Sequence, residues 1–156
     1  MSVYSRILRS VGTRRWFIVV ASRVAPRLDR LVYRVSGRRR LATPPSVTTL
    51  FLTTTGRRTG KLRTAAVTYL ERGDDFIVVG TNWGKTASPE WALNLAADPR
   101  ATIEVAGDRT SVEALTIPVE EQEALWDAFA AMWPAFAVYR RRVTDRTIRM
   151  FRLRAS

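Results

Sequence analysis

A short turn between two apolar segments carries four cations and two glycines. In TTTGRRTGKLRTAA (residues 53–66) the cations are Arg57, Arg58, Lys61 and Arg63. Guanidinium groups bind phosphate or carboxylate through two hydrogen bonds, and glycines let backbone N–H groups approach the same anion. GRRTGK lacks the spacing of a Walker phosphate loop. The segment therefore predicts an anion-binding turn, although a solvated basic turn fits the same residues.

A second polar segment, GTNWGKTASPEWALNLAADP (residues 80–99), has the residue types of a helix start. Ser88-Pro89-Glu90 offers an N-cap, a proline at the first helical position and an acid in the first turn. A helix N-terminus favours anions. Trp83 and Trp91 could wall a flat ring. Trp91 is equally explained as a core residue, whereas Trp83 lies in a loop next to a glycine.

A third segment, WPAFAVYRRR (residues 133–142), clusters aromatic residues and cations near the C-terminus. Core packing with a solvated basic face explains this composition. The functional alternative is an aromatic lid over a hydrophobic substrate.

The chain of 156 residues contains neither cysteine nor histidine. This composition excludes disulfides, thiolate metal sites and nucleophiles activated by histidine, and no metal site is predicted. Any chemistry must therefore use a cofactor, or Tyr, Asp, Glu, Lys and hydroxyl groups. The length fits a chain dominated by one globular domain.

The net charge of +12 is concentrated in the first forty residues. Residues 1–40 hold eleven cations and one anion, whereas residues 41–156 hold fifteen cations and thirteen anions. The nearly neutral body argues against nucleic acid as a partner. We expect residues 1–44 to form a basic arm and linker, and residues 45–156 to form a cofactor-binding domain.

The arm contains a short apolar segment and a basic amphipathic segment. WFIVVAS (residues 16–22) is too short to cross a membrane, and it is followed too soon by arginines to favour a twin-arginine export signal. A cytoplasmic location is therefore expected. PRLDRLVYRV (residues 26–35) predicts a helix that binds an anionic membrane surface on the inner face of the plasma membrane, or one that packs on the body.

The body alternates short apolar strands with a few helices. Runs rich in β-branched residues predict six strands, at residues 46–55, 62–72, 76–82, 101–107, 110–117 and 147–154. Gly107-Asp108-Arg109 is expected as a hairpin turn. One helix should run from residue 88 to about 97. A second should begin near Glu120 and bury Leu125, Ala128, Phe129 and Met132, until Pro134 breaks or kinks it. The expected fold is a small antiparallel β-barrel of the mainly β α+β class, with two or three flanking helices.

These segments, in this order, resemble the deazaflavin-dependent nitroreductase family. The resemblance rests on TTTGRRTGKLRTAAV, GTNWGK, SPEWALNLAADP, WPAF and TDRTIRMFRL, and it covers residues 45–154. It implies a split β-barrel that binds reduced coenzyme F-420, an 8-hydroxy-5-deazaflavin with a phosphate and an acidic tail, in preference to FMN. Such an enzyme transfers hydride to a lipophilic acceptor, such as a quinone or a nitroaromatic compound. Related split-barrel proteins commonly form homodimers, but no residue pattern here decides that question.

The resemblance also implies positions for the site. The turn that binds the phosphate and tail of the cofactor in the family corresponds here to Arg57, Arg58 and Thr59. The strand and helix segments beside the cofactor match Arg63, Thr64, Ala65, Ala66, Val67, Thr68, Val79, Gly80, Thr81, Asn82, Glu90, Trp91, Ala92, Leu93 and Asn94. Asn82 stands where some members carry a phosphate-binding lysine, a contact that Lys85 could replace.

The acceptor pocket is expected around Trp83, Trp133, Phe136 and Tyr139, where some members carry tyrosines. A reduced acceptor needs a proton, and Thr81 and Tyr139 are the candidate catalytic donors. Two alternatives stay open. One is a protein that binds deazaflavin, flavin or haem without turnover, and the other is a membrane-surface or nucleic-acid binding protein that acts through the basic arm, although the neutral body argues against nucleic acid.

Overall fold

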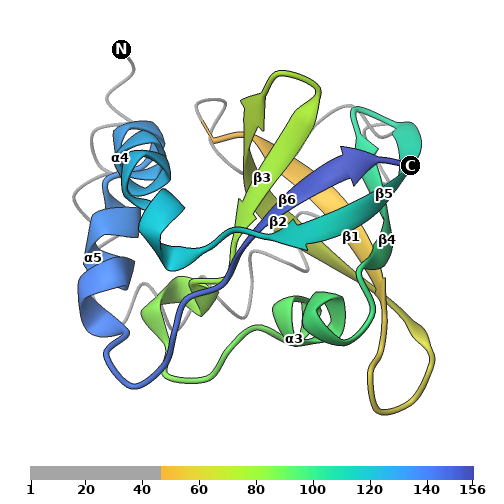
Figure 1. Ribbon diagram of the computed structural model, residues 1–156, viewed down its shortest axis with the longest axis horizontal. Helices are drawn as coiled ribbons and strands as arrows, with labels where there is room; N and C mark the ends of the chain where they lie inside the picture. The colour runs from red at the N-terminus through yellow and green to blue at the C-terminus, as the bar shows by residue number, and fades with distance from the viewer. Residues whose placement is uncertain (1–46) are drawn as a thin grey trace.

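Six antiparallel strands form a closed barrel in the computed structural model, which describes residues 47–156 (Figure 1). Each strand pairs with two neighbours, in the order β1-β2-β3-β6-β5-β4, and β4 returns to β1. The strands are β1 (Thr49–Thr55), β2 (Leu62–Arg72), β3 (Asp75–Val79), β4 (Arg100–Val105), β5 (Asp108–Thr116) and β6 (Met150–Ala155). The predicted fold class, a barrel of about six strands with flanking helices, is confirmed.

The barrel interior is filled by the residues that alternate along each strand. On β1, Leu50 and Leu52 are fully buried, and their cross-strand partners on β2 are Val67 and Ala65. The core cluster inside the barrel also includes residues from β3, β4, β5 and β6. Because successive side chains on a strand point to opposite faces, Thr53 on β1 and its partner on β2 lie on the outer surface.

In the described part of the chain, three α-helices and two short 3-10 helices flank the barrel. They are η1 (Asn82–Gly84), α3 (Glu90–Ala97), η2 (Val119–Glu121), α4 (Glu123–Met132) and α5 (Ala135–Arg142). Helix α3 lies across one end of the barrel, whereas α4 and α5 pack together at its side (Figure 1). A second core cluster joins α4 and α5 to β3 and to the start of β6.

Several predicted boundaries are wrong in their details. Helix α3 begins at Glu90 with Pro89 as its N-cap, so Ser88 does not cap it. The β4–β5 turn consists of Ala106 and Gly107, both with positive φ, because a two-residue turn of this type matches the twist of a hairpin. Strand β5 consequently begins at Asp108, inside the predicted turn.

The second predicted helix is divided into three short helices. The 3-10 helix η2, which was not predicted, precedes α4. The predicted break at Pro134 is confirmed, because this proline lies between α4 and α5. The buried residues of α4 are Trp126 and Phe129, whereas Leu125, Ala128 and Met132 are only partly buried against the core. Trp126 was not among the residues that the sequence predicted to be buried.

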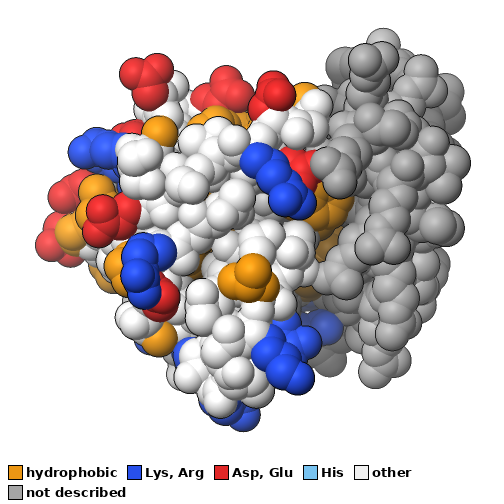
Figure 2. All heavy atoms as spheres, turned by 90° about the vertical axis from the view of Figure 1, so that its right-hand side faces the viewer, with side chains coloured by type: hydrophobic (Ala, Val, Ile, Leu, Met, Phe, Trp, Pro, Cys, Tyr) orange, Lys and Arg blue, Asp and Glu red, His pale blue; other side chains and the backbone are white. Residues whose placement is uncertain are grey.

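The surface of the body carries both signs of charge. Figure 2 shows one face on which Lys and Arg side chains lie among Asp and Glu side chains and scattered apolar ones. Within residues 47–156, no helix has the length and apolarity that a membrane span requires. The predicted basic arm of residues 1–44 lies outside the described residues.

Candidate functional site

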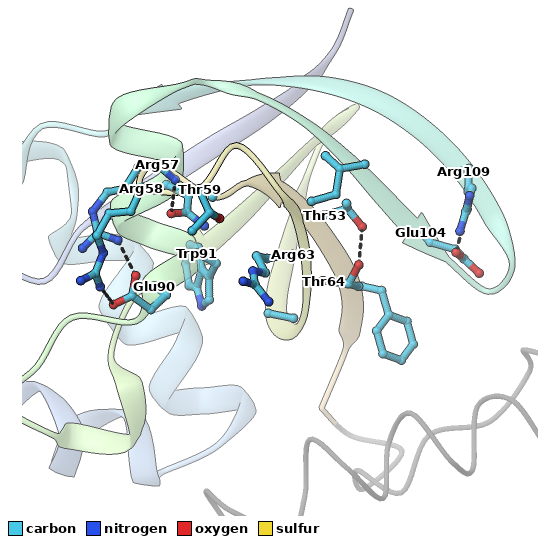
Figure 3. A pocket seen from close by; sticks show the side chains of 15 residues that line it. Thr53, Arg57, Arg58, Thr59, Arg63, Thr64, Glu90, Trp91, Glu104 and Arg109 are labelled. Carbon is cyan, nitrogen blue, oxygen red and sulfur yellow. Dashed lines mark hydrogen bonds and ion pairs between the residues drawn. The ribbon is translucent and has the colours of Figure 1, made fainter.

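Residues 56–61 connect β1 to β2 and are called the basic turn below. This turn opens into a pocket of about 890 Å³ between the β1–β2 hairpin and α3 (Figure 3). Its lining combines cations, hydroxyl groups and two aromatic side chains. The lining residues are Phe51, Thr53, Gly56, Arg57, Arg58, Thr59, Leu62, Arg63, Thr64, Ala65, Glu90, Trp91, Asn94, Glu104 and Arg109. Nine of these belong to the predicted cofactor site, so the structure brings the core of that prediction together.

The turn that carries the arginines is held by its own backbone hydrogen bonds. Strand pairing ends where Thr55 faces Leu62, and residues 56–61 connect the two strands. The N–H of Gly56 donates to the carbonyl of Lys61 at 2.8 Å, and the N–H of Gly60 donates to the carbonyl of Gly56 at 2.7 Å. Gly60 has a φ of +67°, which glycine adopts without strain. The arginines therefore project from a defined turn.

Asn94 of α3 ties this turn to the barrel. Its Oδ1 accepts a hydrogen bond from the backbone N–H of Arg57 at 3.1 Å, and its Nδ2 donates to Oγ1 of Thr54 at 3.0 Å. Asn94 and Thr54 are both buried. Because a buried amide without partners is costly, these bonds fix the helix and the turn relative to each other.

The carboxylate of Glu90 neutralises part of the positive charge of the basic turn. Its Oε2 forms an ion pair with Nη1 of Arg57, and its Oε1 lies 3.3 Å from Nη2 of Arg58. The hydrogen bond from Arg57, helped by the charges of both arginines, lowers the pKa of Glu90 below its ordinary value. The carboxylate is therefore ionised at neutral pH.

The rest of the pocket runs along the outer face of the hairpin. Oγ1 of Thr53 lies 2.9 Å from Oγ1 of its cross-strand partner Thr64. Trp91 is half-buried and packs edge-on against Phe151 of the barrel core, with ring centroids 6.2 Å apart. Figure 3 shows Trp91 and Arg63 between the basic turn and the threonine pair.

The end of the pocket away from the turn carries a second ion pair. Nε of Arg109 on β5 lies 2.9 Å from Oε2 of Glu104 on β4, and Glu104 is buried. Neither residue was predicted from the sequence as part of the site, and the same holds for Phe51 and Thr53. The hairpin register contains the signal for Thr53, because pairing across the turn places it opposite Thr64.

The remaining predicted cofactor residues lie outside the pocket lining, and several of them are buried. Val67, Val79 and Ala92 are buried in the two core clusters. Gly80 packs so closely that a Cβ there would lie 3.3 Å from the Cβ of Ala92. The others are Ala66, Thr68, Thr81, Asn82, Lys85 and Leu93, of which Lys85 is exposed and Thr81 is buried.

The predicted acceptor residues gather in the second core cluster, outside this pocket. Tyr139 lies between two rings, with centroids 6.4 Å from Trp83 and 5.8 Å from Phe136, and Trp133 packs against the same cluster. Burial raises the pKa of Tyr139 to about 12. The structure therefore separates Trp83 from Trp91, which were expected to wall one ring together.

The loop that carries Trp83 is held by Arg146, a residue that sequence analysis did not identify. Its guanidinium donates to the carbonyls of Gly80 at 3.1 Å, Thr81 at 3.0 Å and Lys85 at 3.2 Å. This loop includes three consecutive residues with positive φ, residues 82–84. Left-handed conformations are costly for residues other than glycine, so the arginine stabilises a strained turn. The only sequence signal is its position within TDRTIRMF.

A protein-family comparison matches residues 24–154 to the model described as "F420H(2)-dependent quinone reductase". The chain belongs to this family. Among curated proteins, an F420H(2)-dependent quinone reductase of Mycobacterium tuberculosis is 33% identical over 111 residues, which cover 69% of this chain and 69% of the relative. A protein of Mycobacterium bovis named as a putative F420H(2)-dependent quinone reductase aligns with the same identity and coverage.

Solved structures share the fold of this F420H(2)-dependent quinone reductase family member. An F420-H2 dependent reductase aligns with a TM-score of 0.60 and 26% identity, covering 68% of this chain and 93% of that chain. A protein described as a domain-swapped dimer aligns with a TM-score of 0.62 and 22% identity, covering 81% of this chain and 93% of that chain. At 22% identity, the alignment with the second structure shows only a shared fold.

The pocket of this family member fits the cofactor in its family name. Its volume of about 890 Å³ lies in the range of small-molecule sites. The guanidinium groups of Arg57, Arg58 and Arg63 suit a phosphate and an acidic tail. Trp91 and the threonine pair offer a flat surface and hydroxyl groups for a ring.

Proposed function

We propose that this protein transfers a hydride from reduced coenzyme F-420 to a lipophilic acceptor, a quinone or a nitroaromatic compound. Membership of the F420H(2)-dependent quinone reductase family makes it an F-420-dependent reductase. The single observation that carries the assignment of its site is the pocket in which Arg57, Arg58 and Arg63 lie beside Trp91. The names of its mycobacterial relatives favour a quinone as the acceptor.

The residues of the basic turn would hold the cofactor by its anionic part. Arg57, Arg58 and Thr59 would bind the phosphate and the acidic tail, and Arg63 would approach them from the returning strand. Binding a long anionic group at one end fixes the remainder of the molecule, which lowers the entropy cost of the reaction. Trp91 and Thr64 would border the ring, and the buried residues behind them keep that wall rigid.

When bound, a reduced deazaflavin supplies a hydride. The protein therefore has to position the two reactants and to provide a proton for the reduced acceptor. Thr81 and Tyr139, both buried and outside the pocket lining, are the proposed donors, and the proposed apolar surroundings of the acceptor are Trp83, Trp133 and Phe136 in the core cluster of Tyr139. Because the pKa of Tyr139 is about 12, its hydroxyl keeps its proton at neutral pH, which is the state that a proton donor requires.

The test follows the cofactor spectrum with and without an acceptor. Purified protein is mixed with reduced coenzyme F-420, and menadione is then added while the absorbance of the oxidised cofactor is recorded. The proposal expects menadione-dependent return of that absorbance, at a rate proportional to protein concentration. Tight binding without menadione-dependent or nitroaromatic-dependent oxidation would instead favour a deazaflavin- or flavin-binding protein without turnover.

Location and assembly are proposals of the same kind. We propose a cytoplasmic enzyme that forms a homodimer and contacts the anionic inner face of the plasma membrane through residues 1–40. The net charge of that segment supports the membrane contact, and one solved structure of the same fold is described as a domain-swapped dimer. Light scattering of the full chain tests the dimer. Sedimentation with vesicles tests the membrane contact, which requires binding to anionic but not to neutral vesicles.

A further inference from the structure

We propose that the carboxylate of Glu90 occupies the anion site of the basic turn in the cofactor-free protein, and that the anionic part of the cofactor displaces it. This inference rests on the proposed function, because it concerns the same site. It changes the role of Glu90 from a ligand of the cofactor to an internal competitor with it. Glu90 thereby sets how strongly an acidic ligand must bind before the turn accepts it.

The geometry of Glu90 is that of a bound anion. Each of its carboxylate oxygens faces a different guanidinium, one from Arg57 and one from Arg58 (Figure 3). A phosphate or a tail carboxylate would use the same donors in the same two-point arrangement. Within residues 47–156, Arg63 forms no ion pair, so the pocket keeps one cation that can make the first contact with an incoming anion.

The turn does not depend on Glu90 for its shape. The backbone of Arg57 is fixed by the buried amide of Asn94, and the turn closes through hydrogen bonds between Gly56, Gly60 and Lys61. These contacts remain when the Glu90 carboxylate leaves. Glu90 therefore affects which anion the arginines hold, while other residues decide where the arginines lie.

Displacement of Glu90 is inexpensive. Its side chain is 64% exposed, so the carboxylate can rotate into water, and the side chains of its partners Arg57 and Arg58 are 27% and 73% exposed. Ion pairs this exposed contribute little to stability, because solvent screens the charges and holding two long side chains costs entropy. A phosphate with an attached acidic tail brings several negative charges, and can therefore replace a single carboxylate.

Binding measurements on matched variants test the role of Glu90. Fluorescence titrations with coenzyme F-420, and with its deazaflavin nucleoside that lacks phosphate and tail, are made on wild type, Glu90→Gln and Glu120→Gln. Glu120 is exposed in η2 outside the pocket, so its variant matches the charge change alone. We expect Glu90→Gln to lower the Kd for F-420 on the order of two- to fivefold at low salt. The nucleoside should bind all three proteins equally.

The outcomes separate this inference from the proposed function. If wild type does not bind F-420, the proposed function fails. If wild type binds F-420 while Glu90→Gln binds it equally or more weakly, the function stands and the competitor role is refuted. If Glu120→Gln lowers the Kd for F-420 as much as Glu90→Gln does, the effect comes from net charge alone, and the competitor role of Glu90 is refuted. Glu90→Ser, a second variant with a small polar residue at the helix start, must reproduce the tightening.

Discussion

The side chain of Asn94 bonds to the backbone of Arg57, with 3.1 Å between Oδ1 and the amide nitrogen. The two residues are 37 positions apart in the chain, and the contact joins α3 to the basic turn. Since the other end of the same amide bonds to Thr54 on β1, one buried side chain fixes the three parts of the pocket relative to one another.

Replacing Asn94 should therefore damage both stability and binding. Asn94→Ala leaves the Thr54 hydroxyl and the Arg57 N–H without these partners, and we expect a loss of about 1–3 kcal/mol in the free energy of unfolding. Urea denaturation measures that loss, and titration with coenzyme F-420 should show weaker binding. As a control, Ala97→Ser changes an exposed position at the end of the same helix and should alter neither quantity.

Reversing the charge of the turn should abolish cofactor binding. In Arg57→Glu/Arg63→Glu, two donors for the phosphate and tail become carboxylates that repel them. We expect at least a hundredfold increase in the Kd for F-420, which corresponds to about 2.7 kcal/mol. Arg72→Glu/Arg141→Glu makes the same change in net charge at exposed positions outside this pocket and should bind normally. Full affinity in the first variant would refute the assignment of the anion site.

Loss of Arg146 should release the loop of residues 80–85. Arg146→Met removes donors from three backbone carbonyls, and we expect the free energy of unfolding to fall by about 2–4 kcal/mol. The emission of Trp83, which lies in this loop, should change as well. Arg146→Lys should restore only part of the stability, because an ammonium group lacks the planar fork. Arg149→Met, on the same segment, is the matched control, and an equal loss there would contradict the specific role of Arg146.

The buried hydroxyl of Tyr139 predicts a loss of stability at alkaline pH. Its pKa rises from 10.0 to about 12 on folding, because burial disfavours the charged phenolate. Between these pH values the unfolded chain gives up the proton while the folded chain keeps it, so the free energy of unfolding falls as pH rises. The contribution of this group amounts to about 2–3 kcal/mol over that range.

Comparison of wild type with Tyr139→Phe isolates this effect. The free energy of unfolding should fall less between pH 9 and pH 12 in the variant than in wild type, since the variant has no phenol to ionise at this position. The same variant tests the proposed proton donor. If Tyr139 donates the proton, turnover with menadione should fall while the Kd for F-420 stays unchanged. Unchanged turnover would leave Thr81 as the proposed donor.

Local sequence patterns determined the elements and the chemical character of the site. Runs rich in β-branched residues predicted the six strands, because branched side chains fit a pleated strand. Residue type and spacing also predicted the turn that carries Arg57 and Arg58, and the resemblance placed α3 beside it. The boundaries that failed, at Ser88 and at the β4–β5 turn, depend on single hydrogen bonds and φ values that composition does not specify.

Only the tertiary structure decided which side chains meet. The ion pair of Glu90 with Arg57 joins residues 33 positions apart, and the bond from Arg146 to Gly80 joins residues 66 positions apart. Such contacts depend on how the closed barrel brings distant segments to one end. A periodic pattern along the chain does not predict which distant residues will meet. The sequence alone therefore predicted a basic anion site, and the fold determined that a carboxylate of the same chain is paired with its arginines.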